Sequence, residues 1–221
     1  MTKTRFIREP RFLIFYIGVI LLLVFANTTE KSLRAGIIMI VLGEAIRVWA
    51  TSYLRKSDVL ITTGPYALIR HPLYSGTFLI GLGFCIIARN WYIISTFIIL
   101  YIFVYREKIK KEEGHLLRMF GSEFGKYKAD VPAVIPGLNI FSKEKRKGFN
   151  LGYFFISREL NSFLWVIFFI LIFHLREEVF QEKESFFEAK NLVIIILSGF
   201  FLFLACFNSL LWRIKQKKEK K

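Results

Sequence analysis

The sequence predicts an all-α fold, specifically a multi-pass transmembrane helical bundle. Hydrophobic residues make up 54% of the 221 residues, aromatic residues make up 17%, and the mean hydropathy is +0.45. This composition is too apolar for a soluble domain. The apolar residues also form continuous runs instead of alternating with polar ones, which favours helices over the strands of a membrane barrel.

Six apolar runs define the expected spans. They cover residues 12–26, 33–53, 73–88, 91–105, 151–175 and 192–212. A helix needs about 20 residues to cross a bilayer, and several runs are shorter, so we expect five to six spans within a single membrane domain, residues 1–221. No small-residue cleavage site follows the first run, so we expect a retained helix there. Cys85 and Cys206 lie inside apolar runs, which predicts neither a disulfide nor a metal site.

The basic residues predict the orientation of the bundle. With six spans, 24 of the 32 lysines and arginines fall on the side that holds both termini, the 54–72 loop and the 106–150 segment. An excess of basic residues marks cytoplasmic segments, so both termini are expected in the cytoplasm. We expect an integral membrane protein of the bacterial inner membrane or, in a eukaryote, of the endoplasmic reticulum. The net charge of +15 then reflects topology and attraction to anionic lipid, and nucleic acid is not an expected partner.

The segment 64–76, GPYALIRHPLYSG, has the features of a binding site. It places Arg70 and His71 against the start of an apolar helix, an expensive arrangement unless something polar is held there. Pro65 and Pro72 fix the backbone and keep the residues before them out of helical geometry. The segment is therefore predicted to be a rigid polar hook, with Pro72 in the first turn of the next helix.

A second polar cluster is predicted to lie beside this hook. Charged residues recur at helical spacing after residue 105, so the fourth span should continue as a charged helix. A short turn at Arg89 and Asn90 makes the third and fourth spans an antiparallel hairpin. Residues 70–76 and 105–113 then meet at one membrane edge, where their cationic, aromatic and carboxylate groups suit a ligand with a carboxylate, an ammonium and a flat ring. S-adenosylmethionine has these groups.

Charged residues also occur within the spans. Glu44 and Arg47 are spaced i,i+3 on one helix face, which is compatible with either a structural pair or a site. Arg158, Glu159 and Asn161 near the start of the fifth span predict only an interfacial helix end.

The order and spacing of several motifs resemble the superfamily of isoprenylcysteine carboxyl methyltransferases and phospholipid methyltransferases. The resemblance runs through residues 41–137, which we take as the methyltransferase core, and leaves 151–212 as an additional C-terminal hairpin. The motifs are GEAIRVWA at 43–50, GPY at 64–66, RHPLYSG at 70–76, YR at 105–106, EE at 112–113, FG at 120–121, Phe124, Tyr127, VP at 131–132 and IP at 135–136. Each motif alone is weak, and together they are specific.

The resemblance implies a membrane methyltransferase that takes S-adenosylmethionine from the cytosol, in a pocket on that side, and a lipophilic or prenylated acceptor from the bilayer. It assigns cofactor contacts to Tyr66, His71, Pro72, Leu73, Tyr74 and Glu112. Arg70, Arg106, Lys108 and Glu113 are the expected catalytic residues, and no metal is expected. Lys108 stands where members that act on prenylcysteine have arginine, and these two side chains are not equivalent at a carboxylate site.

The sequence leaves the methyl acceptor open. The carboxylate of a prenylated cysteine is already ionised at neutral pH, whereas a phospholipid ammonium must first lose a proton, for which Glu113 is the candidate base. An NADPH-dependent oxidoreductase related to sterol reductases and a lipid-binding protein without catalysis are the remaining alternatives. Ligand titration would separate them.

Overall fold

The computed structural model describes residues 25–53, 59–136, 149–180 and 185–218. The helical elements of this part of the chain are α2 (Glu30–Thr51), the short 3-10 helix η1 (Gly64–Ala67), α3 (Pro72–Ala88), α4 (Trp91–Asp130), α5 (Gly152–Ile156), α6 (Arg158–Phe180) and α7 (Ala189–Lys218). These ranges contain no strand, which confirms the all-α prediction. The first predicted span, 12–26, lies almost entirely outside the described residues.

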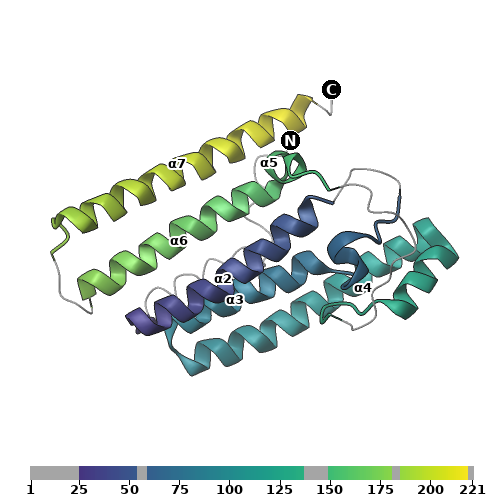
Figure 1. Cartoon of the computed structure of the whole chain (residues 1–221), viewed down its shortest axis with the longest axis horizontal. Helices are drawn as coiled ribbons and strands as arrows, with labels where there is room; N and C mark the ends of the chain where they lie inside the picture. Colours follow the sequence, from purple (N-terminus) through teal and green to yellow (C-terminus); the bar gives the residue numbers. More distant parts are fainter. Residues whose placement is uncertain (1–24, 54–58, 137–148, 181–184, 219–221) are drawn as a thin grey trace, which may run out of the picture.

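The long helices lie side by side in the order α7, α6, α2, α3 and α4 (Figure 1). The closest packing joins α2 to α3, where glycines seven residues apart on each helix face one another. A Cβ atom on Gly43 would lie 2.6 Å from the carbonyl oxygen of Gly76, and one on Gly36 would lie 2.5 Å from that of Gly83. Small residues at such positions let helix backbones approach closely, as expected in a membrane bundle.

The predicted hairpin between the third and fourth spans is confirmed. Arg89 ends α3 in the left-handed conformation at φ 51°, and the Asn90 side chain caps α4 by accepting hydrogen bonds from the amides of Tyr92 and Ile93. The predicted continuation of the fourth span is also confirmed, because α4 extends through the charged segment to Asp130. Gly121 interrupts it with φ 51° and ψ −125°, a conformation open almost only to glycine, and the chain turns back there (Figure 1).

The C-terminal hairpin covers the other side of α2. Phe173 of α6 joins α2 and α3 in one buried core cluster and packs against Phe84. At the start of α6, the Arg158 guanidinium lies 3.6 Å from the Trp212 ring centroid, and Ser209 donates a 3.0 Å hydrogen bond to Asn161. The prediction of one continuous helix over 151–175 was wrong, because Ser157 adopts an extended conformation at φ −84° and ψ 170° that separates α5 from α6.

One helix of the described residues meets the length and hydropathy expected of a membrane span. Among the described residues, only the Ala189–Trp212 part of α7 is both long and apolar enough to cross a bilayer, and α3 is apolar but has 17 residues. Charged residues such as Glu44, Arg47 and Glu159 lower the hydropathy of α2 and α6, although they pair inside the bundle. The multi-pass topology therefore stays a prediction.

Candidate functional site

The hook folds as predicted around its two prolines. Gly64 has φ +64°, and a Cβ atom there would lie 2.6 Å from the Tyr53 ring, so both backbone and space require glycine. Pro72 occupies the first turn of α3, and His71 before it is non-helical at φ −125° and ψ 60°. The Tyr127 hydroxyl donates a 2.6 Å hydrogen bond to the carbonyl oxygen of Tyr66 and ties η1 to the end of α4.

The segment after α4 pairs with the hook along its backbone. The amides of Arg70 and His71 donate to the carbonyl oxygens of Pro132 and Ala133 at 2.9 and 3.0 Å. The Ser75 hydroxyl donates to the carbonyl oxygen of Val134 at 2.6 Å. The turn at Gly121 is what returns this segment to the hook, so a glycine that does not line the cavity shapes it.

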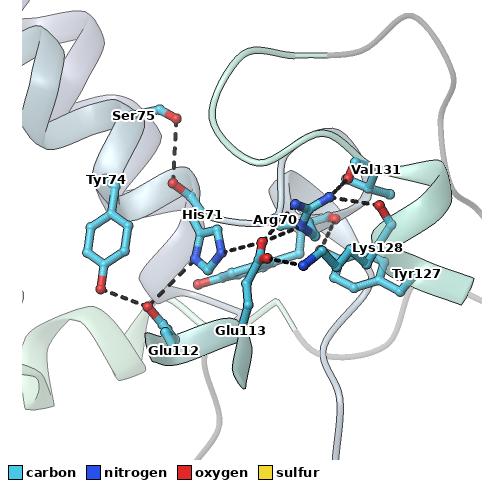
Figure 2. Close-up of polar contacts among 10 residues, drawn as sticks. Arg70, His71, Tyr74, Ser75, Glu112, Glu113, Tyr127, Lys128 and Val131 are labelled. Carbon is cyan, nitrogen blue, oxygen red and sulfur yellow. Dashed lines mark hydrogen bonds and ion pairs between the residues drawn. The ribbon is translucent and has the colours of Figure 1, made fainter. Parts of the chain in front are cut away.

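Arg70, Glu113 and Lys128 form a closed ion cluster behind the hook, which we call the Arg70 cluster (Figure 2). Arg70 donates from Nε and Nη2 to Glu113 Oε1 at 2.9 and 2.7 Å, and from Nη1 to the carbonyl oxygens of Lys128 and Val131. Lys128 Nζ lies 2.7 Å from Glu113 Oε2. Burial raises the pKa of Glu113, but hydrogen bonds from Lys128 and Arg70 outweigh it, so the pKa lies below its ordinary value of 4.5.

His71 lies between the two adjacent glutamates of α4 (Figure 2). Its Nε2 is 3.4 Å from Glu113 Oε1, and its Nδ1 is 3.6 Å from Glu112 Oε2. Burial lowers the pKa of His71 below 6.5, against the raising effect of both carboxylates. The ring also stacks on Tyr74, whose hydroxyl donates a 2.7 Å hydrogen bond to Glu112.

A cavity of about 260 Å³ lies between the hook and α4. It is lined by every residue predicted to contact the cofactor: Tyr66, His71, Pro72, Leu73, Tyr74 and Glu112. Arg70 lines it too, whereas Glu113 stands behind Arg70 and His71. The Tyr66 hydroxyl is a buried oxygen without a hydrogen-bond partner among the described residues, which marks an unfilled polar position beside the cavity.

The other two predicted catalytic residues lie elsewhere on α4. Lys108 Nζ lies 4.8 Å from the centroid of the Tyr74 ring and 5.3 Å from that of Tyr105, beside the cavity but outside its lining. Arg106 is exposed and also lies outside the lining.

Sequence reasoning missed part of the site. Lys128 was assigned no role, and neither were the lining residues Leu60, Leu116, Met119, Phe120 and Tyr127. Tyr127 and Phe120 belong to motifs named above, which was the available signal. Lys128 carried no such signal, because its approach to Glu113 depends on the turn at Gly121.

A second buried ion cluster, the Arg47 cluster, lies between α2 and α6. Arg47 donates from Nε and Nη2 to Glu159 Oε2, the former at 3.1 Å, and its Nη1 lies 3.9 Å from Glu44 Oε1. The i,i+3 pair is thus present, with Glu159 as the stronger partner. The interfacial position predicted for Glu159 gave no hint of this contact, which joins residues 112 positions apart.

His174, Glu177 and Glu178 gather at the opposite end of α6. Their potential metal-ligand atoms lie within 4.8 Å of one another. Lys190 Nζ lies 2.6 Å from Glu178 Oε2, so an ammonium already neutralises part of this cluster.

Comparisons with known proteins identify the family of this chain. Residues 13–123, half of the chain, match the phospholipid methyltransferase family. The chain belongs to this family. The matched region contains the hook, α3 and Glu112–Glu113 and ends before Lys128 and the α6–α7 hairpin.

The similar proteins fall into two groups by name, metal-resistance proteins and isoprenylcysteine O-methyltransferases. The chain is 30% identical over 137 residues to the nickel-cobalt-cadmium resistance protein NccN of Alcaligenes xylosoxydans xylosoxydans, covering 61% of this chain and 63% of the relative. It is 31% identical over 98 residues to the protein-S-isoprenylcysteine O-methyltransferase of Schizosaccharomyces pombe, covering 44% and 42%. It is 31% identical over 113 residues to the human protein of the same name, covering 46% and 40%. The chain spans less than two thirds of the length of each.

Proposed function

We propose that this chain is an S-adenosylmethionine-dependent methyltransferase that methylates an acceptor embedded in the membrane. The observation that carries the proposal is that all six residues expected to contact the cofactor line one cavity, although they come from segments about 40 positions apart. Membership of a methyltransferase family and relatives named as isoprenylcysteine O-methyltransferases support it.

The residues of the cavity fit this cofactor. Tyr66 offers an unpartnered hydroxyl, and Glu112 offers a carboxylate that is 45% exposed and accepts a hydrogen bond from Tyr74. Leu73, Leu116 and Phe120 provide apolar surface for a flat base. When bound, the cofactor supplies an electrophilic methyl group on a sulfonium. Orientation of both reactants in a dry site contributes roughly 7–11 kcal/mol to lowering such a barrier, so no covalent catalysis is required.

Glu113 acts in this proposal by holding other residues in position. Its carboxylate is committed to Arg70 and Lys128, and its pKa is lowered, which makes it a weak base. It fixes the Arg70 guanidinium and the His71 ring at the cavity edge. This arrangement favours an acceptor that needs no deprotonation, and we therefore propose a carboxylate, such as that of a prenylated cysteine, over a phospholipid amine.

The same proposal assigns Lys108 and Arg106 to the anionic part of the acceptor. Lys108 is the better placed, because its ammonium lies over the Tyr74 and Tyr105 rings next to the cavity. Amine methylation remains the second candidate, since Glu112 is accessible and not committed to an arginine or lysine in the described contacts.

We also propose that the bundle spans the membrane several times with the cavity on the cytoplasmic side. The start of α3, the end of α4 and the C-terminal part of α7 lie at one end of the bundle (Figure 1). Segments rich in lysine and arginine belong to this end, and such segments favour the cytoplasm.

Titration of the purified protein with S-adenosylhomocysteine and with NADPH tests the cofactor assignment. We expect S-adenosylhomocysteine to bind, and His71→Ala and Glu112→Gln each to weaken binding about tenfold, because a polar partner that the bound ligand buries contributes roughly 1–3 kcal/mol. Glu123→Gln, on the exposed surface of α4 outside the cavity, is the matched control. Binding of NADPH alone would indicate an oxidoreductase, and binding of neither would indicate a non-catalytic lipid-binding protein.

A further inference from the structure

The Arg47 cluster lies next to the proposed reaction site, at the end of the hook. Tyr74, which lines the cavity, packs edge-to-face on Tyr105 at 5.1 Å between ring centroids, and Tyr105 stacks on Tyr101 at 3.9 Å. Arg47 itself packs against Gly76, the last residue of the hook, where a Cβ atom would lie 2.6 Å from Arg47 Cγ. An acceptor that approaches the cavity from inside the bundle would meet this cluster.

We propose that Arg47 is a further cation for the anionic group of the methyl acceptor, in addition to Lys108, and that the Glu159 carboxylate competes with that group for Arg47. Glu159 then determines how strongly this chain selects for or against acidic acceptors. The inference rests on the proposed methyltransferase function. It concerns a residue outside the region that matches the family, because Glu159 belongs to the C-terminal hairpin.

Burial supports an exchange in which Arg47 stays and Glu159 leaves. The Arg47 side chain is 9% exposed and the Glu159 side chain is 25% exposed. A buried guanidinium needs an anion, because an unpaired buried charge is strongly unfavourable. A carboxylate with access to water loses less on leaving the pair, so an incoming acid can take its place on the guanidinium.

Glu44 brings a second carboxylate to the cluster without pairing fully with Arg47. Its Oε1 is buried and has no hydrogen-bond partner among the described residues, and the closest guanidinium nitrogen is 3.9 Å away. Glu44 and Glu159 thus place two carboxylates beside one arginine. An acid that bound without displacing Glu159 would add a third, whereas exchange keeps the number at two. Electrostatics therefore makes binding of an acid depend on the release of Glu159.

Other contacts hold the start of α6 in place without Glu159. Arg158 stacks on Trp212 and Asn161 accepts a hydrogen bond from Ser209, so two neighbouring residues fasten α6 to α7. The Ser157 hydroxyl accepts a 3.0 Å hydrogen bond from the Glu159 amide, which depends on the backbone and not on the carboxylate. The carboxylate can thus be changed while the hairpin remains.

The test compares N-acetyl-S-farnesylcysteine with its primary amide, which differ only in the charge of the group that would face Arg47. In Glu159→Gln, we expect KM and Kd for the acid to fall about tenfold, because the competing charge is gone. The amide has no carboxylate to methylate, and its Kd should stay unchanged. Asn161→Ala, which loosens the same helix turn without touching Arg47, should change neither constant. Glu159→Asp, with a shorter carboxylate, should give an intermediate shift for the acid.

An unchanged ratio of acid to amide binding in Glu159→Gln would overturn the proposal, as would an equal shift in Asn161→Ala. If Glu159→Gln does not fold, Glu159→Asp alone decides, and an unchanged ratio there has the same meaning. The proposed function fails separately, if the wild type neither binds S-adenosylhomocysteine nor transfers labelled methyl to any acceptor. Calorimetric titration of the acid and the amide still tests Glu159 in that case.

Discussion

The Arg70 cluster and the Arg47 cluster each pair an arginine with a glutamate from a helix distant in the sequence, but they differ in how fully their groups are hydrogen-bonded. Arg70 donates to one carboxylate and two backbone carbonyls, and Glu113 receives Lys128 on its other oxygen. Arg47 has one strong carboxylate partner and one at 3.9 Å, and a buried oxygen of Glu44 has no hydrogen-bond partner among the described residues.

This difference in hydrogen bonding indicates that the two clusters have different roles. A network in which every member is paired holds its surroundings rigid, and the Arg70 cluster fixes the hook and the returning segment at 131–134. A cluster whose arginine has one strong carboxylate partner, itself partly exposed, can exchange that partner for a ligand carboxylate. The family match contains the hook and Glu113, whereas Glu159 lies beyond it, so the satisfied cluster is mostly built from the family region and the incomplete one is completed by the hairpin.

The largest expected difference between the clusters is in the free energy of unfolding, when Glu113→Gln is compared with Glu159→Gln. The first variant leaves two cations near one another without an anion, and we expect the apparent free energy of unfolding to fall by about 3 kcal/mol. The second should cost about 1 kcal/mol, because Arg47 keeps Glu44 and gains an amide acceptor. Titration of the purified protein in mixed micelles with SDS measures both. Equal losses would show that the clusters do not differ in this way.

A smaller effect on the Arg70 cluster alone is expected from Gly121→Ala. A Cβ atom there meets nothing within 4 Å, so the cost comes from the backbone at φ +51° and amounts to roughly 1–3 kcal/mol. Gly125→Ala is the matched control, because Gly125 is helical and also open, and it should be neutral or stabilising. If Gly121→Ala is as stable as the wild type and binds S-adenosylhomocysteine normally, the turn does not govern the cavity.

The smallest expected effect is a change in the stability of the protein with pH, caused by the titration of His71 and Glu113. Both have lowered pKa values in the folded protein, so each contributes stability that is present above its ordinary pKa and is lost as pH falls toward the folded value. Stability should first decline below pH 6.5 through His71, and again below pH 4.5 through Glu113. Thermal unfolding between pH 4 and pH 8 measures the decline, and His71→Gln should remove its first part. A flat profile for the wild type over that range would contradict the assignment.

The positions of the hook and the charged helix followed from local sequence rules. Two prolines and Gly64 set the shape of the hook, and Asn90 with Arg89 set the turn that brings residue 70 beside residue 113. These are short-range effects of backbone geometry and helix periodicity. The six cofactor residues came from the family resemblance, and the cavity contains all of them.

Contacts over long separations were not predictable in the same way. Lys128 reaches Glu113 only because α4 turns back at Gly121, and Arg47 reaches Glu159 across 112 positions because α6 packs on α2. The sequence showed buried charges that needed partners, since burial without a partner is costly, but any of several glutamates satisfies that need. Local patterns therefore determined most of the helices and the hook, and the family resemblance supplied six of the cavity residues. Helix packing, which depends on all side chains at once, decided which charges pair and which remain open to a ligand.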